Sequence, residues 1–546
     1  MTDLYQYLPG FTIEYKDGGL TIPRETVTTN SVTLIGTATD GPKHEPVSVY
    51  RPEDAELVFG KPYNVANGIA NGTSLLLGML ESYNAGCRDI RLVRVGGEFA
   101  SANIEDITAV TPGKAIKLTA VYAGSLYNNT AYTVIVVESK ATTLTITKPA
   151  EKGSSTLTFN ITPTMTIEEL IKLINDNPNN NVVIAELGED GILADVAADV
   201  LAVKPATKLT GGSDGLNMTA DDTYHEMYHA YQAIEDYETD SISVLGLYAD
   251  DVYPVGHAKA GEEIGYAEQL ANHCANVSER GIETFGVIAC KPIATVSQTN
   301  VKTKVTALRT RTNANKYYKI KVTHDEEAGT FTFPAYEKNV LTGIQISVGH
   351  YVNVVAMPEL QFVHPVIGRY YAPGAAAYAG LISSLPAESA PTNKILSNVR
   401  SLRYKLSPAQ LNDLTEYNYV TFKNRTEGVA VTDGCTASAP LANGQKSDYS
   451  RLSTMRIVFA AVKLVREEAE PFIGEPNELP QRNALNTAIK SGLNKMKTAG
   501  AITAHRFSIT ATLEQKILGE SYIDLELVPA LENRKIRVNV SLRATF

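Results

Sequence analysis

The chain has 546 residues and a mass of 59.0 kDa, with 44% hydrophobic and 20% charged residues. This is a globular composition with room for about three or four domains. A net charge of -11 argues against nucleic acid as a partner, because phosphate neutralisation requires clustered Lys and Arg. There is no apolar run of about 18 residues, and the N-terminal stretch is too polar for a signal peptide. We therefore expect a soluble protein made in a cytoplasm, with no membrane insertion.

The charge is unevenly spread along the chain. Residues 445–546 contain 15 Lys and Arg against 11 Asp and Glu, a net charge of +4, which leaves -15 for the first 444 residues. A basic C-terminal part beside an acidic body predicts complementary protein surfaces. These surfaces would meet either between copies of the chain or with a separate acidic partner.

The first part of the chain combines an extended arm with an α/β pattern. Residues 1–24 mix short β-favouring pieces with Pro and Gly, so we expect an extended N-terminal arm. From Ser31 the pattern is a buried strand, a short helix closed by Gly60, a longer apolar helix and a second strand. This order predicts an α/β core that begins within residues 25–100.

Residues 101–209 have a different character, with short Thr-rich alternating segments separated by turn signals. This density of short strands predicts a separate, inserted β-sandwich domain. One helix interrupts it, with Thr166 as its N-cap and Glu169 completing a capping box. The stretch LTGGSDG, residues 209–215, lacks the features of a P-loop or a dinucleotide site. We therefore interpret it as a structural turn.

Residues 210–440 return to the α/β pattern. A helix over about 220–236 is followed by apolar strands and helices in alternation, which predicts a mainly parallel sheet covered on both faces. The segment APGAAAYAGLISSLPAESAPTNK, residues 372–394, is rich in Gly, Ala and Pro, and it is interpreted as loop-rich. The role of residues 296–350 stays open.

Residues 441–546 form a third part, for which we expect an α+β C-terminal assembly domain. A long amphipathic helix begins near Asp448, and a second helix follows near Asn483. Three strand candidates complete this part: HRFSITATL, SYIDLELVPAL and KIRVNVSLRATF.

HEMYH, residues 225–229, matches the H-E-x-x-H pattern by which metalloprotease helices bind zinc. The alternative function is therefore a zinc metalloprotease that uses His225, Glu226 and His229. The two histidines share a helix face, but Asp236 lies about 10 Å farther along the axis than His229, beyond reach of the same ion. Four scattered cysteines without a C-x-x-C motif indicate buried reduced thiols. We therefore expect an ordinary helix, no metal and no cofactor.

A second catalytic candidate is Ser74 in NGTSLLLG, which is similar to the nucleophile segment of subtilisin-like proteases. Those enzymes place Asp, His and Ser in that order, whereas only His44 precedes Ser74 here. Thr73 or Ser74 as a helix N-cap explains the segment better. We therefore expect no catalytic residues and no enzyme.

Several segments together resemble the tail sheath protein of contractile-tailed bacteriophages and of related phage-derived contractile injection systems. The segments are VTLIGTATDGPKHEPVSVYRPEDAELVFG, SYNAGCRDIRLVRV, LTAVYAGSLYNNTAYTV, LTGGSDG, YSRLSTMRIVFAAVKLVREEAEPFIGEPN and LNKMKTAGAI. They follow one another in the family's order. The family's aromatic and Arg-rich stretch before the C-terminal helix is replaced here by RTEGVAVTDGCTASAP, and the chain has no Trp.

The resemblance implies a structural virion protein with a subtilisin-like α/β core domain that lacks a catalytic triad. Such a protein polymerises as a homo-oligomer around the tail tube and contracts to drive the tube through the host cell envelope for genome delivery. The implied partners are the tail tube protein, the baseplate, and the tail terminator or neck proteins. The implied location is the virion tail, assembled in the host cytoplasm.

Two sets of residues are predicted to make subunit contacts. The arm and the last strand suit β-augmentation, in which main-chain pairing links neighbours. The predicted linking strands are Phe11, Thr12, Ile13, Glu14 and Tyr15, and Lys535, Ile536, Arg537, Val538, Asn539, Val540, Ser541 and Leu542, continuing to Thr545. The predicted tube-facing residues, for which a solvated helix face is the alternative, are Arg451, Arg456, Lys463, Arg466, Lys490, Lys495 and Lys497. A third hypothesis, an adhesion module built on the inserted domain, predicts small monomers.

Overall fold

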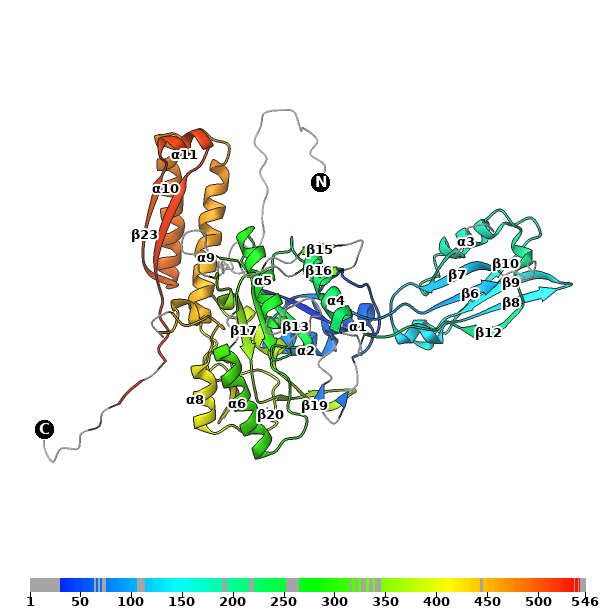
Figure 1. Ribbon diagram of the computed structural model, residues 1–546, viewed down its shortest axis with the longest axis horizontal. Helices are drawn as coiled ribbons and strands as arrows, with labels where there is room; N and C mark the ends of the chain where they lie inside the picture. Colours follow the sequence, from blue (N-terminus) through cyan, green and yellow to red (C-terminus); the bar gives the residue numbers. More distant parts are fainter. Residues whose placement is uncertain are drawn as a thin grey trace, which may run out of the picture.

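The computed structural model describes most of residues 30–540. The residues outside the description are 1–29, 63–64, 67–68, 71–74, 106–112, 189–193, 216–219, 252–264, 315–316, 321–322, 326–329, 333–336, 339–344, 442–444, 535, 539 and 541–546. Figure 1 shows a central α/β core, an inserted unit that projects from it, and a C-terminal unit on the opposite side.

The core is built on a six-stranded sheet with the order β17-β14-β13-β1-β5-β2. These strands are β17 (Val352–Val355), β14 (Phe285–Ala289), β13 (Ser241–Tyr248), β1 (Ser31–Gly36), β5 (Asp89–Arg94) and β2 (Pro46–Val49). Only the edge strand β2 is antiparallel to its neighbour. β1, β14 and β17 are buried along their whole length, as parallel strands covered on both faces should be. The predicted parallel sheet is confirmed.

Helices cover both faces of this sheet. They are α2 (Leu75–Ala85) and α7 (Ala375–Ser384) on one face, and α4 (Ala220–Ala233), α5 (Tyr266–Glu279) and α6 (Gln298–Ala314) on the other. Successive residues of a strand point to opposite faces. Leu34 of β1 accordingly packs with α2 and α7, and Ile35 packs with α4 and α5.

α7 corrects the expectation of a loop-rich segment over residues 372–394. Its Gly380 lies against α2, where an added Cβ would come within 2.4 Å of the Ser82 carbonyl oxygen. The Ser82 hydroxyl also donates to the Ala376 carbonyl oxygen at 2.7 Å. The small residues that suggested a loop instead allow two buried helices to pack closely.

Smaller elements surround the central layers. They are the sheet of β20 (Ser401–Leu402), β18 (Leu360–His364), β19 (Gly368–Ala372), β4 (Ile69–Ala70) and β3 (Val65–Ala66), the hairpins of β21 (Phe422–Arg425) with β22 (Gly428–Val431) and of β15 (Thr323–Asp325) with β16 (Thr330–Thr332), and the helices α1 (Pro52–Phe59) and α8 (Pro408–Glu416). Gly60, with φ 81°, ends α1 as predicted. Within residues 296–350, α6 packs into the core through Val301, Val305 and Leu308.

The inserted unit consists of two sheets and a helix around a core of its own. Its elements are β10 (Thr156–Asn160), β9 (Lys140–Thr147), β8 (Ala131–Val137) and β12 (Lys204–Lys208) in one sheet, β11 (Val183–Leu187), β7 (Lys114–Ala120) and β6 (Ser101–Glu105) in the other, and α3 (Ile167–Asn175). The capping box of α3 is present as predicted, with the Thr166 hydroxyl accepting from the Glu169 amide at 3.2 Å.

The C-terminal unit pairs two long helices with a hairpin (Figure 1). Its elements are α9 (Leu452–Ala469), α10 (Leu479–Ala499), β23 (Ile502–Thr510), α11 (Leu513–Leu518) and β24 (Tyr522–Pro529). Two of the three predicted strands are therefore present. The third candidate begins at residue 535, and its described residues, 536–538 and 540, belong to no strand.

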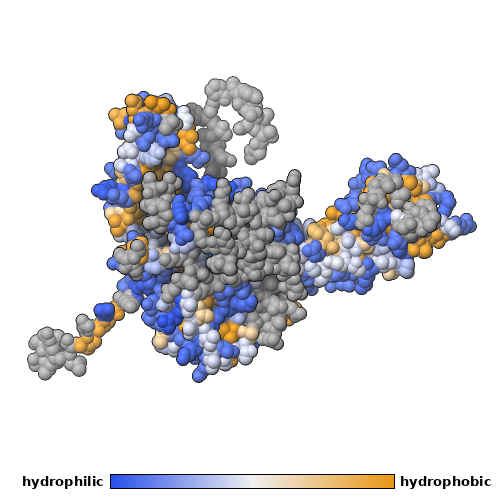
Figure 2. Space-filling model, in the orientation of Figure 1, coloured by the Kyte–Doolittle hydropathy of each residue, from blue (hydrophilic) through white to orange (hydrophobic). Residues whose placement is uncertain are grey.

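The surface is mostly polar, and Figure 2 shows apolar residues gathered at the end of the C-terminal unit that carries α11. All four cysteines are buried and free of disulfides, as predicted. Burial raises the pKa of Cys87 and of Cys435 to about 12, so both are thiols at neutral pH. No helix among the described residues is both long and apolar enough to cross a bilayer.

Candidate functional site

Glu226, the central residue of HEMYH, is a structural anchor on α4. Its carboxylate is 2.7 Å from the Lys43 ammonium and 2.9 Å from His44 Nε2, and it accepts from the Gly96 amide at 2.6 Å. Burial raises the pKa of Glu226, but the hydrogen bonds from His44 and Lys43 outweigh burial and lower the pKa to about 2. A carboxylate held in this way is a poor general base near neutral pH.

One histidine of HEMYH, His229, lies near this anchor. The ring centroid of His229 is 5.4 Å from that of His44. On the predicted core face of the helix, Tyr224, Met227 and Ile234 are buried. In the part of the chain that the structure describes, no group of three or more His, Cys, Asp or Glu is arranged to hold a metal ion. The zinc-protease hypothesis therefore finds no ligand set there.

Polar contacts also fix the inserted unit to the core, beside Gly96. Asp40 accepts a hydrogen bond from the Tyr127 hydroxyl at 2.7 Å. Asp214 accepts from both the amide and the hydroxyl of Ser125, each at 2.7 Å. Glu226 of HEMYH, by contrast, holds residues of the core itself, namely Lys43, His44 and Gly96.

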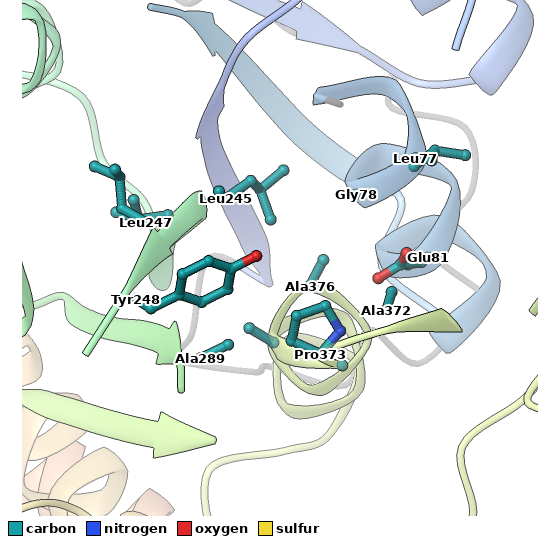
Figure 3. A pocket seen from close by; sticks show the side chains of 14 residues that line it. Leu77, Gly78, Glu81, Leu245, Leu247, Tyr248, Ala289, Ala372, Pro373 and Ala376 are labelled. Atoms are coloured by element: carbon teal, nitrogen blue, oxygen red, sulfur yellow. The ribbon is translucent and has the colours of Figure 1, made fainter. Parts of the chain in front are cut away.

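A small cavity lies at the carboxyl ends of β13 and β14, where open α/β sheets usually carry their ligands (Figure 3). Its volume is ≈ 30 Å³, whereas ligand pockets usually measure about 300–1,000 Å³. Glu81 is its one charged lining residue. Burial raises the pKa of Glu81 to about 8, although a hydrogen bond with the Tyr370 hydroxyl lowers this pKa to a smaller extent. The cavity lining contains no His, Ser, Cys, Lys or Asp, so no catalytic set meets there. Thr73 and Ser74 lie outside the described residues.

Four of the seven predicted tube-facing residues instead hold the C-terminal unit against the core. The pairs are Arg451 with Asp433 at 2.8 Å, Arg456 with Asp240 at 3.3 Å, Lys463 with Glu238 at 2.8 Å and Arg466 with Glu283 at 3.0 Å. Arg456 is only 2% exposed, and it also donates to the carbonyl oxygens of Leu385 and Pro386. Its assignment as a tube-facing residue is therefore wrong for this conformation, because its charge is used inside the fold.

The other three tube-facing candidates lie on the surface. Lys490, Lys495 and Lys497 are exposed on the C-terminal half of α10. They form no ion pair with any residue that the structure describes. They remain predicted contact residues.

The hairpin of β23 and β24 is incompletely covered. Within the described residues these two strands pair only with each other. Their inner-face residues, which include Phe507, Ile523 and Leu525, pack on α9 and α10 but are only partly buried. A two-stranded sheet with a partly open apolar face is suited to accept further strands.

Most of the described residues after β24 are exposed and belong to no strand or helix. Ile536, Val538 and Val540 alternate with polar residues, and each is more than three-quarters exposed. This period-2 pattern would place the three apolar side chains on one face of a strand. The predicted linking residues Lys535, Asn539, Ser541 and Leu542, and all of Phe11 to Tyr15, lie outside the described residues.

A charged cluster, which sequence reasoning missed, anchors the root of this extended segment. Asp433 is 3% exposed and accepts from Arg451 and from Arg534. The Thr392 hydroxyl lies 3.1 Å from Glu532 and 3.2 Å from Asp433. Burial raises the pKa of Asp433, but Arg451 and Arg534 outweigh it and lower the pKa below its usual range. No local sequence pattern reveals the cluster, because its members come from three separate segments.

Solved structures of sheath tail proteins share this fold. The sheath tail protein of Desulfitobacterium hafniense aligns with a TM-score of 0.53 at 11% sequence identity, covering 95% of this chain and 100% of that chain. The sheath tail protein of Listeria innocua aligns with a TM-score of 0.52 at 13% identity, covering 92% of this chain and 95% of that chain. The anti-feeding prophage helical sheath in its contracted state has a TM-score of 0.46 at 11% identity, over 98% of this chain and 99% of that chain.

The first two alignments extend over nearly the whole of each chain, so this chain has the sheath tail protein fold. The resemblance found in the sequence is thereby confirmed at the level of the fold. No protein-family model matches the sequence, and none of the curated proteins matches it.

Proposed function

We propose that this chain, which has the fold of sheath tail proteins, is the contractile sheath subunit of a phage tail or of a phage-derived injection system. It polymerises around a tail tube and contracts to drive that tube through a cell envelope. Its partners are further copies of itself, the tube protein, the baseplate and the terminator or neck proteins. It acts in the virion tail, after assembly in the host cytoplasm, as a structural protein without a cofactor.

The observation that carries the proposal is the incompletely covered apolar surface of the C-terminal unit. Its hairpin leaves an apolar face partly open, and the chain then runs out as an extended segment with Ile536, Val538 and Val540 exposed. Exposed apolar groups in such a pattern favour burial against another surface. A second copy of the chain offers that surface, because its own hairpin is also incomplete.

Subunit linkage by β-augmentation fits these features. Residues 535–545 of one subunit, and residues 11–15 of another, would add strands to the hairpin of a neighbour. Main-chain hydrogen bonds then connect the subunits, while the domains that carry these linking strands rotate relative to one another. The anchor of Arg534 on Asp433 fixes the point at which the outgoing strand leaves the core.

The core is proposed to be a subtilisin-like α/β domain that has no catalytic role. Its parallel sheet supports this assignment, and the absence of nucleophile and base from the cavity lining fits a structural scaffold. Contraction then needs no nucleotide. Subunits assembled in a metastable extended lattice release free energy when they form larger contacts.

Lys490, Lys495 and Lys497 are the remaining candidates for contact with an acidic surface, either of the tube or of a neighbour. Their stems cover apolar surface while their ammonium groups reach carboxylates.

Electron microscopy of the purified protein tests the proposal. A sheath subunit forms long hollow tubes, whereas an adhesion module stays monomeric. Deletion of residues 1–24 should abolish the tubes and leave folded monomers, and normal tubes from the truncated chain would refute the linkage by strands. Stoichiometric zinc that is lost in a His225→Ala variant would instead favour the metalloprotease.

A further inference from the structure

The end of the C-terminal unit, made of residues 470–479 and 511–522, is here called the tip. It consists of the loop between α9 and α10 together with α11 and its flanks, and it lies at the top of the unit in Figure 1. The Asn477 amide donates to the Glu520 carbonyl oxygen at 2.9 Å, and the Ser521 hydroxyl donates to the Asn477 side chain at 3.3 Å. These bonds join the two segments into one surface.

Large aliphatic side chains gather on the tip (Figure 2). Ile473 is 81% exposed, Leu479 61%, Leu513 76% and Ile517 77%. A cavity of ≈ 280 Å³ lies beside them, with Phe472 in its lining. Apolar side chains concentrated in this way on a soluble chain mark a contact surface.

The tip is also acidic. Its charged residues are Glu470, Glu475, Glu478, Glu514, Glu520 and Lys516, a net charge of -4. Because residues 445–546 total +4, the remainder of that segment carries +8, of which residues 530–546 contribute +3. The C-terminal unit therefore has an acidic apolar end and a basic body.

The free cations of that body lie on the same helix as part of the tip. All three basic residues of α9 are paired with the core, whereas Lys490, Lys495 and Lys497 of α10 are exposed and form no ion pair with the described residues. α10 begins at Leu479 in the tip. At 1.5 Å per residue, the three lysines lie about 16–27 Å farther along its axis.

We infer that the tip of one subunit docks on the Lys490–Lys497 face of α10 in a second copy. This inference rests on the proposed sheath function and identifies a further contact surface between its subunits. Lysine stems cover the exposed leucine and isoleucine side chains while their ammonium groups meet the carboxylates of the tip. Such a head-to-tail contact uses different surfaces on the two subunits, and it therefore propagates into an open helical polymer.

Charge reversal tests the contact. A tip variant, Glu478→Lys with Glu514→Lys, and a helix variant, Lys490→Glu with Lys497→Glu, should each raise the critical concentration for polymerisation about tenfold or more. The chain that combines all four substitutions should polymerise like the wild type, because the two reversed surfaces again have opposite charge. Sedimentation velocity and electron microscopy measure polymer formation. The matched control, Glu53→Lys with Glu168→Lys, reverses two exposed carboxylates far from the tip and should have no such effect.

The outcomes separate the possible partners of the tip. If both reversed variants polymerise normally, the inference is overturned, and if they lose only binding to preformed tail tubes, the tube is the partner and the inference is also overturned. If the fourfold variant does not recover polymerisation, the variant Leu513→Gln with Ile517→Gln decides. Normal polymerisation of this variant overturns the inference. A tenfold rise in its critical concentration, without a change in thermal unfolding, supports the inference. A wild-type chain that forms no polymer at all would reject the proposed function itself.

Discussion

The central sheet and the C-terminal hairpin are two sheets of one chain that are covered to very different degrees. β1, β14 and β17 are buried at every position, between helices on both faces. β23 and β24 alternate exposed with partly buried residues, and both outer edges of the hairpin are unpaired within the described residues. The core therefore completes its own packing, whereas the C-terminal unit leaves apolar surface open.

The difference indicates where the chain relies on other subunits. Substitutions in the core should act on folding of the single chain, because its contacts are internal. Substitutions in the hairpin, the tip or the extended segment should act on assembly and leave the monomer folded. Four substitutions test this division, from the largest expected effect on the folded chain to the smallest.

The largest effect is expected at Gly380, where α7 touches α2. In a Gly380→Val variant the new side chain meets the Ser82 backbone, so the two helices must separate. We expect a loss of about 3 kcal/mol or more in the free energy of unfolding, or no soluble protein. The control Ala484→Val, on an exposed position of α10, should cost about 0.5 kcal/mol. Equal urea midpoints for the two variants would contradict the close packing of α2 and α7.

A second test removes the buried charge that joins the two regions. Arg456→Met leaves Asp240 buried without its partner, which should cost about 3–5 kcal/mol in chemical unfolding. Adding Asp240→Asn should recover part of this loss, because no unpaired charge is then buried. Lys463→Met removes a neighbouring pair whose Glu238 is mostly exposed, and it should cost only about 0–1 kcal/mol.

A third test concerns the acid stability of the core. The folded-state pKa of Glu226 is lowered from 4.5 to about 2, so its ion pair with Lys43 and its hydrogen bonds stabilise the native state above pH 4.5. This stabilisation is lost as the pH falls from about 4.5 toward about 2. Glu226→Gln should therefore lose about 2–3 kcal/mol at pH 7 and show a flatter decline in unfolding free energy below pH 4.5. If the wild type and the variant declined in parallel, the anchor role of Glu226 would be refuted.

These regions also differ in how far the sequence predicts them. The N-terminus of α3 is predictable from the sequence, because Thr166 and Glu169 form a local capping signal three residues apart. α7 was missed, because its small residues make sense only when α2 lies against Gly380. Arg456 was assigned to a surface for a similar reason. Its partner Asp240 is 216 residues away in sequence, and no local pattern reveals such a pair.

The smallest effect on the free energy of unfolding is expected at Arg534, where the extended segment leaves the core. The same substitution should have a clear local effect on hydrogen exchange. Arg534 is partly exposed, and Asp433 keeps Arg451 as a partner when Arg534 is removed. Arg534→Ala should therefore change the unfolding free energy by about 1 kcal/mol or less. Hydrogen exchange at Ala530, whose amide donates to the Ala501 carbonyl oxygen at 2.9 Å, should nevertheless become faster, because the anchor to Asp433 is lost while the folded core remains. The control Arg537→Ala, in the exposed part beyond the anchor, should leave both measurements unchanged. Unaltered exchange in Arg534→Ala would mean that the direction of the outgoing segment is set by something other than this charge cluster.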